Sequence, residues 1–261
     1  MNPKLMGVIN VTPDSFSDGG QYLDPAAAVR HGEELVRDGA VILDIGGEST
    51  RPGAEEVDEA EELSRVEPVV QALAGHAAVS IDTSKLAVAE ATLDAGASIV
   101  NDVTAFRHEP ALAGLCAERG VEVVLMHMPG NPRTMQDDPR YDDVVDDVKA
   151  FLAERVEFAV EAGIAEGRIW VDPGIGFGKT LEHNLELLRR LGELRELGRP
   201  LVVGTSRKSF IGKVDGSDVE DRIGGSIATS VLAAAEGADV LRVHDVAEMA
   251  QALTVTNAVL G

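Results

Sequence analysis

The sequence alternates short, continuous apolar runs with longer amphipathic segments, and it does so eight times within 261 residues. Continuous apolar runs are typical of parallel strands buried on both faces, and amphipathic segments are typical of the helices that cover them. Strands are predicted at Leu5–Asn10, Val41–Ile45, Ala78–Asp82, Ser98–Asn101, Val121–His127, Ile169–Asp172, Leu201–Gly204 and Val240–Val243. Helices are predicted near residues 25–38, 58–74, 85–95, 109–119, 143–163, 181–197, 219–236 and 245–259.

Glycines mark the ends of the predicted helices. Six of them, at positions 39, 96, 120, 163, 198 and 237, lie just past the end of a helical segment, where a left-handed residue commonly ends a helix. Eight consecutive βα units in a chain of this length predict an α/β fold, a closed (β/α)8 TIM barrel that forms a single domain over residues 1–261. A doubly wound open sheet is the alternative for the same order of elements.

The chain is strongly acidic, with 45 Asp and Glu against 23 Lys and Arg and a net charge of −22. Such a surface repels nucleic acid and anionic membranes, so neither is expected as a partner. No apolar run approaches the roughly 20 residues that cross a bilayer, and the N-terminus opens directly into a predicted strand, so no signal peptide is expected. The single cysteine, Cys116, excludes an internal disulfide and a multi-thiolate metal site. These features together favour a cytoplasmic protein.

Polar residues end nearly every predicted strand. In a barrel, the carboxyl ends of the strands face the mouth where catalysis occurs. The residues at these positions are Asn10, Asp44, Asp82, Asn101, Asp102, His127, Asp172, Thr205, Ser206, Arg242 and His244. Capping of the following helix explains one or two of them, with Asp102 as the best example, but not a similar ending on eight strands. We therefore expect most of these side chains to line an active site.

The residues near the strand ends fall into two chemical groups. Asp82, Asn101 and Asp172 can accept hydrogen bonds from N–H donors, and the amide can also donate, which suits a heterocycle with amino and lactam edges. A second group is cationic or can become so, and comprises Arg51, Arg207, Lys208, Arg242 and His244. In a chain of net charge −22, cations at the mouth predict an anionic ligand, with phosphate or carboxylate as the leading candidates.

Other motifs in the chain are weaker. Residues 173–180 (PGIGFGKT) resemble a phosphate-binding P-loop, but proline occupies the position of the required first glycine. Their glycines are expected to let the backbone turn sharply after Asp172. His127 has no metal-ligand partner at a useful spacing, and it either lines the mouth or is a satisfied structural residue. No Ser-His-Asp set is visible, although Ser206 and His244 follow neighbouring strands.

Seven segments, taken together and in order, resemble the dihydropteroate synthases of the pterin-binding barrel family. The resemblance covers essentially the whole chain. The segments are Met6–Gly20 (MGVINVTPDSFSDGG), Asp44–Gly53 (DIGGESTRPG), Ser80–Thr83 (SIDT), Asn101–Val103 (NDV), Asp172–Lys179 (DPGIGFGK), Gly204–Ser209 (GTSRKS) and Arg242–Asp245 (RVHD).

The resemblance implies a transferase reaction. Members of the family join 6-hydroxymethyl-7,8-dihydropterin pyrophosphate to p-aminobenzoate with Mg²⁺, giving 7,8-dihydropteroate and pyrophosphate in folate biosynthesis. By this resemblance, the residues expected to hold the pterin are Asp82, Asn101, Met126, Asp172 and Lys208. Those expected to hold the pyrophosphate are Asn10, Thr50, Arg51, Arg242 and His244, with Asn10 also a metal ligand.

The resemblance also implies a site for p-aminobenzoate. Its expected residues are Phe16, Pro52, Phe177, Ser206 and Lys208, and two loops complete it with Asp14, Phe16, Thr50, Arg51 and Pro52. The expected catalytic residues are Asp82, Asp172, Lys208, Arg242 and His244. An Sn1-like path through a cation delocalised on the dihydropterin needs no covalent nucleophile, in agreement with the lack of a visible triad. The resemblance further implies a homodimer and a target of sulfonamides.

Two alternatives stand beside this interpretation. A related pterin-barrel methyltransferase, which moves a methyl group from methyltetrahydrofolate to a corrinoid protein, would share the pterin half of the site. It would not need residues 12–17 (TPDSFS) or the cationic residues after the last two strands. A non-catalytic pterin-binding protein would bind ligand without turnover, and such proteins usually lack loop or strand-end residues that are all present here.

Overall fold

The computed structural model describes residues 1–12, 25–49 and 57–261. Eight strands form one sheet in the order β6-β5-β4-β3-β2-β1-β8-β7, and every neighbouring pair is parallel. The strands are β1 (Lys4–Asn10), β2 (Ile42–Gly46), β3 (Ala78–Asp82), β4 (Ile99–Asp102), β5 (Glu122–Met126), β6 (Ile169–Asp172), β7 (Val202–Val203) and β8 (Val240–Val243). A parallel bridge between Val171 and Leu201 joins the two ends of the sheet, which confirms the closed barrel and excludes the open sheet.

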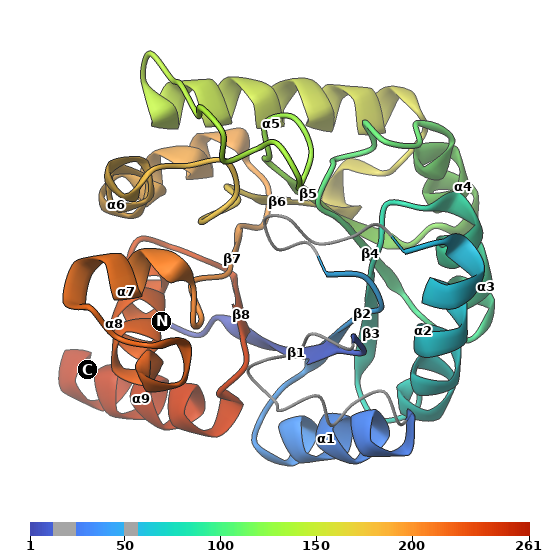
Figure 1. The fold of residues 1–261 in the computed structure, drawn as a ribbon, viewed down its shortest axis with the longest axis horizontal. Helices are drawn as coiled ribbons and strands as arrows, with labels where there is room; N and C mark the ends of the chain where they lie inside the picture. The colour runs from blue at the N-terminus through green and yellow to red at the C-terminus, as the bar shows by residue number, and fades with distance from the viewer. Residues whose placement is uncertain (13–24, 50–56) are drawn as a thin grey trace.

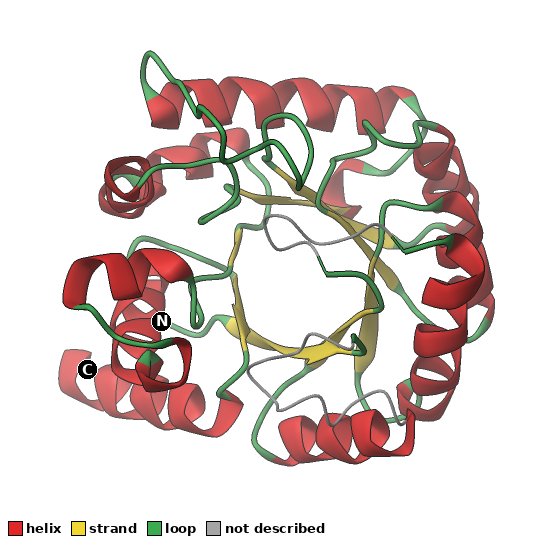
Figure 2. Ribbon diagram, viewed as in Figure 1, coloured by secondary structure: helices red, strands yellow, loops and turns green. Residues whose placement is uncertain are grey.

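Helices surround the strands on the outside of the barrel (Figure 1, Figure 2). They are α1 (Pro25–Arg37), α2 (Glu59–Leu73), α3 (Leu86–Asp94), α4 (Ala111–Arg119), α5 (Val144–Glu161), α6 (Leu181–Arg189), α7 (Ser209–Asp215), α8 (Ile223–Ala235) and α9 (Val246–Leu260). Side-chain caps fix several starts, because Asp58 accepts a hydrogen bond from the first turn of α2 and Asp143 does so for α5. The six glycines predicted to end helices all have positive φ, as expected.

Three predicted elements differ in detail. The predicted helix over residues 181–197 is α6 followed by a 3-10 helix, Leu191–Leu197, in which Gly192 weakens the helical preference. The predicted helix over residues 219–236 begins as a separate 3-10 turn, Val219–Asp221, before α8. No helix was predicted between residues 204 and 219, but this segment contains the seven-residue helix α7, which the left-handed Gly216 ends. Such a short helix has too little periodicity to be recognised from sequence.

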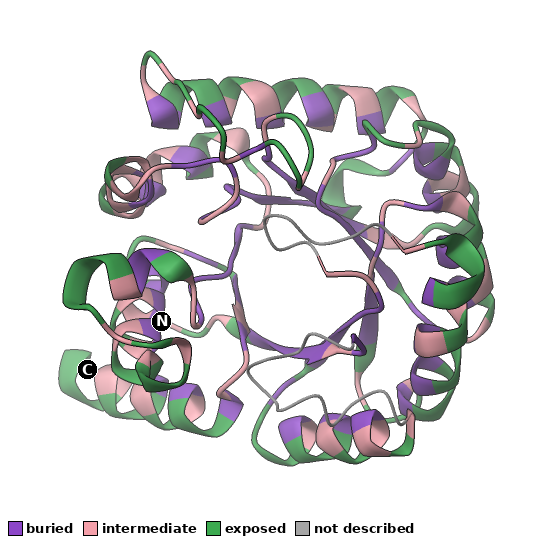
Figure 3. Cartoon of the chain, in the orientation of Figure 1, coloured by how far each residue is buried: buried purple, intermediate pink, exposed green. Residues whose placement is uncertain are grey.

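The core has two parts. A large cluster of buried aliphatic residues fills the space between the strands and the helices. A smaller cluster fills the barrel interior with Met6, Ile42, Ile99, Val124, Trp170, Val202 and Val240. The strands are almost continuously buried, whereas the outer faces of the helices are exposed (Figure 3). Because the barrel interior is packed, a ligand has to bind at the mouth. Within the described parts of the chain, no helix is long and apolar enough to cross a membrane.

Candidate active site

The register of the sheet places the predicted polar residues at one level of the barrel. Asn10 of β1 pairs with Gly46 of β2, Gly46 pairs with Asp82 of β3, and Asp82 pairs with Asn101 of β4. At the end of β6, Asp172 is the register partner of Met126 on β5. Because parallel strands end at the same edge, residues far apart in sequence become neighbours at the mouth.

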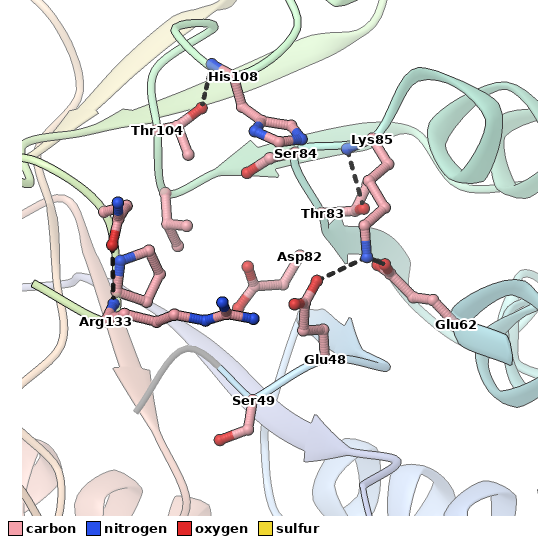
Figure 4. Close-up of a pocket in the computed structure, with 13 residues that line it drawn as sticks. Glu48, Ser49, Glu62, Asp82, Thr83, Ser84, Lys85, Thr104, His108 and Arg133 are labelled. Atoms are coloured by element: carbon pink, nitrogen blue, oxygen red, sulfur yellow. Dashed lines mark hydrogen bonds and ion pairs between the residues drawn. The ribbon is translucent and has the colours of Figure 1, made fainter. Parts of the chain in front are cut away.

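Two adjoining cavities open at this level. The first, the mouth cavity, has a volume of about 380 Å³ and is lined by several predicted site residues, among them Asn10, Asp82, Phe177, Ser206, Lys208, Arg242 and His244. The second has a volume of about 250 Å³ and lies toward β3 and the loops after β4 and β5. Asp82, Glu48 and Ser49 line both cavities, so Asp82 stands at their junction (Figure 4).

Arg242 links the carboxylates of the mouth. Its Nε lies 2.6 Å from Asp44 Oδ2 and its Nη2 lies 3.0 Å from Asp82 Oδ2. Asp44, which is completely buried, also accepts a hydrogen bond from Asn101 Nδ2 at 3.1 Å. Burial raises the pKa of Asp82, and the nearby Asp44 raises it further, while Arg242 lowers it. The arginine therefore favours the ionised form of Asp82, in opposition to burial, whose effect on the pKa is larger.

Lys208, which follows β7, interacts electrostatically with Asp172 at the end of the adjacent strand β6. The Asp172 carboxylate accepts a hydrogen bond from the N–H of Gly174 at 2.7 Å, and burial raises its pKa while Lys208 lowers it. Lys208 donates from Nζ to the carbonyl of Ile175, and Nζ lies 4.8 Å from the centre of the Phe177 ring. Burial lowers the pKa of Lys208 to about 8, although Asp172 opposes this effect. A lysine of this kind can lose or hold a proton near neutral pH.

Apolar residues form a wall beside these polar groups. Met126 and Met128 from the end of β5 pack with Val103, Met135 and Phe177 in a separate buried cluster. Methionine side chains adapt to flat aromatic faces, so this wall suits the faces of a planar ring. The edge of such a ring could then form hydrogen bonds with the carboxylates and the amide.

Ser206 and His244 are in contact, as their position after neighbouring strands suggested. Ser206 Oγ lies 3.0 Å from His244 Nδ1 and accepts a hydrogen bond from the N–H of His244. Arg207 lines the mouth cavity, as expected, and its guanidinium makes a two-point ion pair with Asp245. Arg242 is paired in the same way with Asp44 and Asp82, so both arginines have carboxylate partners within the protein.

Two other strand-end residues are structural. His127 is buried, and its Nδ1 lies 2.9 Å from Lys179 Nζ, so it is a satisfied structural residue rather than part of the cavity lining. Asp102 accepts hydrogen bonds from Ser84, Thr104 and the N–H of Phe106. It therefore stabilises the turn after β4 and does not cap α4, which begins after Pro110.

This arrangement has close counterparts among known proteins. The family described as pterin binding enzyme matches residues 6–244. The chain belongs to this family. A dihydropteroate synthase of Escherichia coli (strain K12) is 48% identical over 261 residues, which cover 99% of this chain and 92% of that protein.

Two solved structures of dihydropteroate synthase from Xanthomonas albilineans are similar over 100% of this chain and 94% of theirs. The structure with 4-aminobenzoic acid has a TM-score of 0.93 at 50% identity. The structure in complex with 7,8-dihydropteroate has a TM-score of 0.89 at 47% identity. The similarity thus extends over the whole barrel of this pterin binding enzyme, including every described strand end.

The predicted residues of the two substrate sites are placed as follows. Asp82, Phe177, Ser206 and Lys208 line the mouth cavity, whereas Asn101, Met126 and Asp172 are buried and are not among its lining residues. In the pyrophosphate set, Asn10, Arg242 and His244 line the mouth cavity. The predicted loop residues Asp14, Phe16, Thr50, Arg51 and Pro52 lie outside the described residues.

Sequence reasoning missed some lining residues. Glu48 and Arg222 line the mouth cavity, and Arg133 lines the second cavity, where Figure 4 draws its guanidinium pointing toward Asp82. Glu48 belongs to the segment 44–53 that carried the resemblance, so its position near a strand end was a usable signal. Arg133 and Arg222 come from a loop and a helix start, where no strand-end argument applies.

A candidate metal ligand was predicted at Asn10. The described residues include no group of three or more His, Cys, Asp or Glu side chains that could hold a metal ion. Asn10 offers one amide oxygen to the mouth cavity. Because Mg²⁺ keeps several waters and commonly binds substrate phosphates with one or two protein oxygens, this donor set fits an ion that arrives with a pyrophosphate group.

A buried ion cluster supports the second cavity. Lys85 Nζ lies 2.6 Å from Glu62 Oε2, 2.7 Å from Glu48 Oε2 and 2.5 Å from the carbonyl of Val57 (Figure 4). The Glu62 side chain is only 1% exposed, and burial raises its pKa while Lys85 lowers it. The lysine therefore compensates a carboxylate that would otherwise be very costly to bury.

Lys85→Met is expected to lower the free energy of unfolding by about 3–5 kcal/mol, because it leaves Glu62 buried without its charged partner. Urea denaturation at neutral pH measures the change. Adding Glu62→Leu to the same chain should recover most of the loss, since both buried charges are then gone. A double variant as unstable as Lys85→Met alone would contradict this account of the cluster.

Proposed function

We propose that this pterin binding enzyme is a dihydropteroate synthase. It would join 6-hydroxymethyl-7,8-dihydropterin pyrophosphate to p-aminobenzoate and release pyrophosphate. The observation that carries the proposal is the junction of unlike groups in one cavity: Asp82 beside Lys208 and Arg242, with the apolar wall at Phe177. With its single thiol buried at Cys116, the chain suits a cytoplasmic location, which we also propose.

The pterin is proposed to bind at the carboxylate side of the mouth. Its amino and ring N–H groups would donate to Asp82 and Asp172, and Asn101 would read a lactam edge. Met126 and Phe177 would contact the ring faces. Ionised carboxylates also favour a positive charge that develops on the dihydropterin when the C–O bond to pyrophosphate breaks.

The pyrophosphate is proposed to lie toward Asn10, Arg242 and His244. Arg242 already contacts Asp82, so one guanidinium connects the pterin edge with the anion edge. Cations at this position stabilise the charge that grows on the leaving oxygen. An Mg²⁺ ion, proposed to be bound through Asn10 and the substrate, would supply further stabilisation of the same charge.

The p-aminobenzoate is proposed to approach from the side of Phe177, Ser206 and Lys208. Lys208 Nζ lies over the Phe177 ring and interacts with the Asp172 carboxylate, so it would stand between the two substrates. The departure of pyrophosphate before attack by the aniline nitrogen is the Sn1-like path that needs no covalent nucleophile. Such a path requires the site to exclude water, which competes for the cation.

A homodimer is proposed from the resemblance and is supported by the surface of α8. Leu232 is 60% exposed on this helix, and on the neighbouring helix α9 Val255 and Val259, which lie four residues apart on one face, are 58% and 79% exposed. Large apolar side chains that cluster on surface helices are typical of residues covered by a partner. Light scattering should give the mass of a dimer for the wild-type chain and of a monomer for Leu232→Glu; a monomeric wild type would contradict the proposal.

Asp82→Asn is expected to weaken pterin binding about tenfold to 100-fold, because an NH2 group, which only donates, replaces one of the two oxygens that can accept from the ring N–H groups. Pyrophosphate affinity should change less than about threefold, since Asn10, Arg242 and His244 stay in place. Isothermal titration with pterin and with pyrophosphate separates the two. Asp94→Asn, at the exposed end of α3, is the matched control. Unchanged pterin affinity would count against the ring assignment.

The assay that tests the function combines the purified chain with the pterin pyrophosphate, p-aminobenzoate and Mg²⁺. We expect release of pyrophosphate with formation of 7,8-dihydropteroate, and competitive inhibition by a sulfonamide against p-aminobenzoate. A parallel reaction offers methyltetrahydrofolate and a corrinoid methyl acceptor. Methyl transfer without condensation would favour the methyltransferase, and ligand binding without either product would favour a non-catalytic pterin-binding protein.

A further inference from the structure

The turn after β6 is held by side chains at every carbonyl from Gly174 to Gly178. The donors come from three parts of the chain. Gln136 Nε2 donates to the carbonyl of Gly176 at 2.8 Å, and the Tyr141 hydroxyl donates to that of Gly178 at 2.7 Å. Lys208 donates to the carbonyl of Ile175. Lys179 donates to both remaining carbonyls, those of Gly174 and Phe177, each at 2.9 Å.

The turn is also pressed against the loop after β5. Gly174 has φ +66°, and a Cβ there would lie 2.0 Å from the carbonyl oxygen of His127. Gly178 has φ +58°, and a Cβ there would lie 2.2 Å from Pro129 Cγ. These glycines allow a close approach that no other residue permits, so the turn has one conformation in which it fits.

Lys179 is the only one of these donors that is completely enclosed. Its side chain is 2% exposed, and its third contact is His127 Nδ1 at 2.9 Å. An ammonium group has three donors, and here each has an acceptor. Burial lowers the pKa of His127, which keeps the imidazole neutral so that Nδ1 can accept. Burial lowers the pKa of Lys179, and the nearby Asp172 opposes this effect by favouring the charged form.

Lys179 binds the backbone next to the residues that contact Lys208: one of its carbonyls directly precedes Ile175, and the other belongs to Phe177. Ile175, whose carbonyl accepts from Lys208, follows Gly174 directly, and the Phe177 ring lies 4.8 Å from Lys208 Nζ. We propose that Lys179 is a positioning residue for the reaction, which holds this turn so that Ile175 and Phe177 fix Lys208 at the p-aminobenzoate side of the mouth. The inference rests on the proposed synthase activity.

The test compares Lys179→Met with Lys149→Met in the full chain. Lys149 makes an ion pair with Glu196 at the surface, so it is a matched Lys-to-Met control. For Lys179→Met we expect kcat to fall about 100-fold, since misplacement by about 1 Å has this effect. We expect KM for p-aminobenzoate to rise about tenfold and pterin affinity to change less than about threefold. A merely structural role would lower the melting temperature and leave both KM values unchanged.

A second readout does not depend on activity. The sequence has six phenylalanines, so a chain labelled with 4-fluorophenylalanine gives few fluorine resonances, and Phe177→Leu identifies that of Phe177. This resonance should move in Lys179→Met and stay in place in Lys149→Met. An unmoved resonance in Lys179→Met would overturn the positioning role of Lys179, whether or not the wild-type chain is active. An inactive wild-type chain would instead contradict the proposed function.

Gln136→Leu keeps the proposal testable if Lys179→Met does not fold. Gln136 is only half-buried, and its loss removes the donor to Gly176 from the same turn. We expect a smaller rise in KM for p-aminobenzoate and a shifted Phe177 resonance. Wild-type values for both would show that the conformation of the turn does not control the site, and would overturn the proposal.

Discussion

Lys208→Ala is expected to lower kcat/KM by about 10³-fold while the melting temperature stays close to that of the wild type. The ammonium group stands between Asp172 and the Phe177 ring, and the methyl group of alanine can neither stabilise charge nor orient a substrate. Steady-state kinetics with both substrates measures the loss. Lys213→Ala, an exposed lysine of α7, is the matched control and should keep wild-type activity. Near-normal turnover of Lys208→Ala would refute its role.

The pH dependence gives an independent check on the same residue. Burial lowers the pKa of Lys208 to about 8, so its ammonium loses a proton as the pH rises through this value in the free enzyme. Since kcat/KM reports groups of the free enzyme, it should fall above about pH 8. In Lys208→Arg the guanidinium stays charged, so the remaining activity should lack this fall. An alkaline limb that persists in Lys208→Arg would assign it to another group.

Arg242→Met is expected to affect both stability and turnover. It leaves Asp44, which is completely buried, and Asp82 without their cation, and the free energy of unfolding should fall by about 3–5 kcal/mol. Turnover should fall about 10²–10³-fold, since the guanidinium is also the proposed partner of the leaving pyrophosphate. Chemical denaturation and kinetics measure the two effects, and Arg242→Lys should be intermediate because one ammonium replaces a two-pronged donor.

The sign of the pH effect on this variant follows from Asp82. Its pKa in the folded protein is raised above the ordinary value of 3.8, and removal of Arg242, which lowers it, raises it further. A carboxyl of this kind binds its proton more tightly in the folded chain, so its contribution to stability is present in acid and is lost as the pH rises. Because the pKa of Asp82 is about 8 with Arg242 in place, the deficit of Arg242→Met should be larger at about pH 9 than at about pH 6. An equal deficit at both would mean that Asp82 does not need its cation.

The sequence determined the barrel and the level of the site. Eight βα units are predictable because each element leaves its own pattern. A strand buried on both faces is a continuous apolar run, and a helix buried on one face is an amphipathic segment. The polar residues that interrupt these runs, such as Asp82, Asn101 and Asp172, then have to lie at one mouth, since all strands of a parallel barrel end at the same face. The seven segments carried the family resemblance for the same reason, because each lies at or beside a strand end.

Only the tertiary structure decided which partners these side chains take. The barrel brings Arg242 of β8 to Asp44 and Asp82 of β2 and β3, and it pairs Arg207 with Asp245. The turn after β6 looked like a broken phosphate loop in sequence, but its carbonyls are bound by side chains from other loops. Such pairings depend on distances across the mouth, which local sequence patterns do not encode. The sequence thus determined that the active site lies at the carboxyl ends of the strands, and the packing of the barrel determined which ion pairs and hydrogen bonds its polar side chains form.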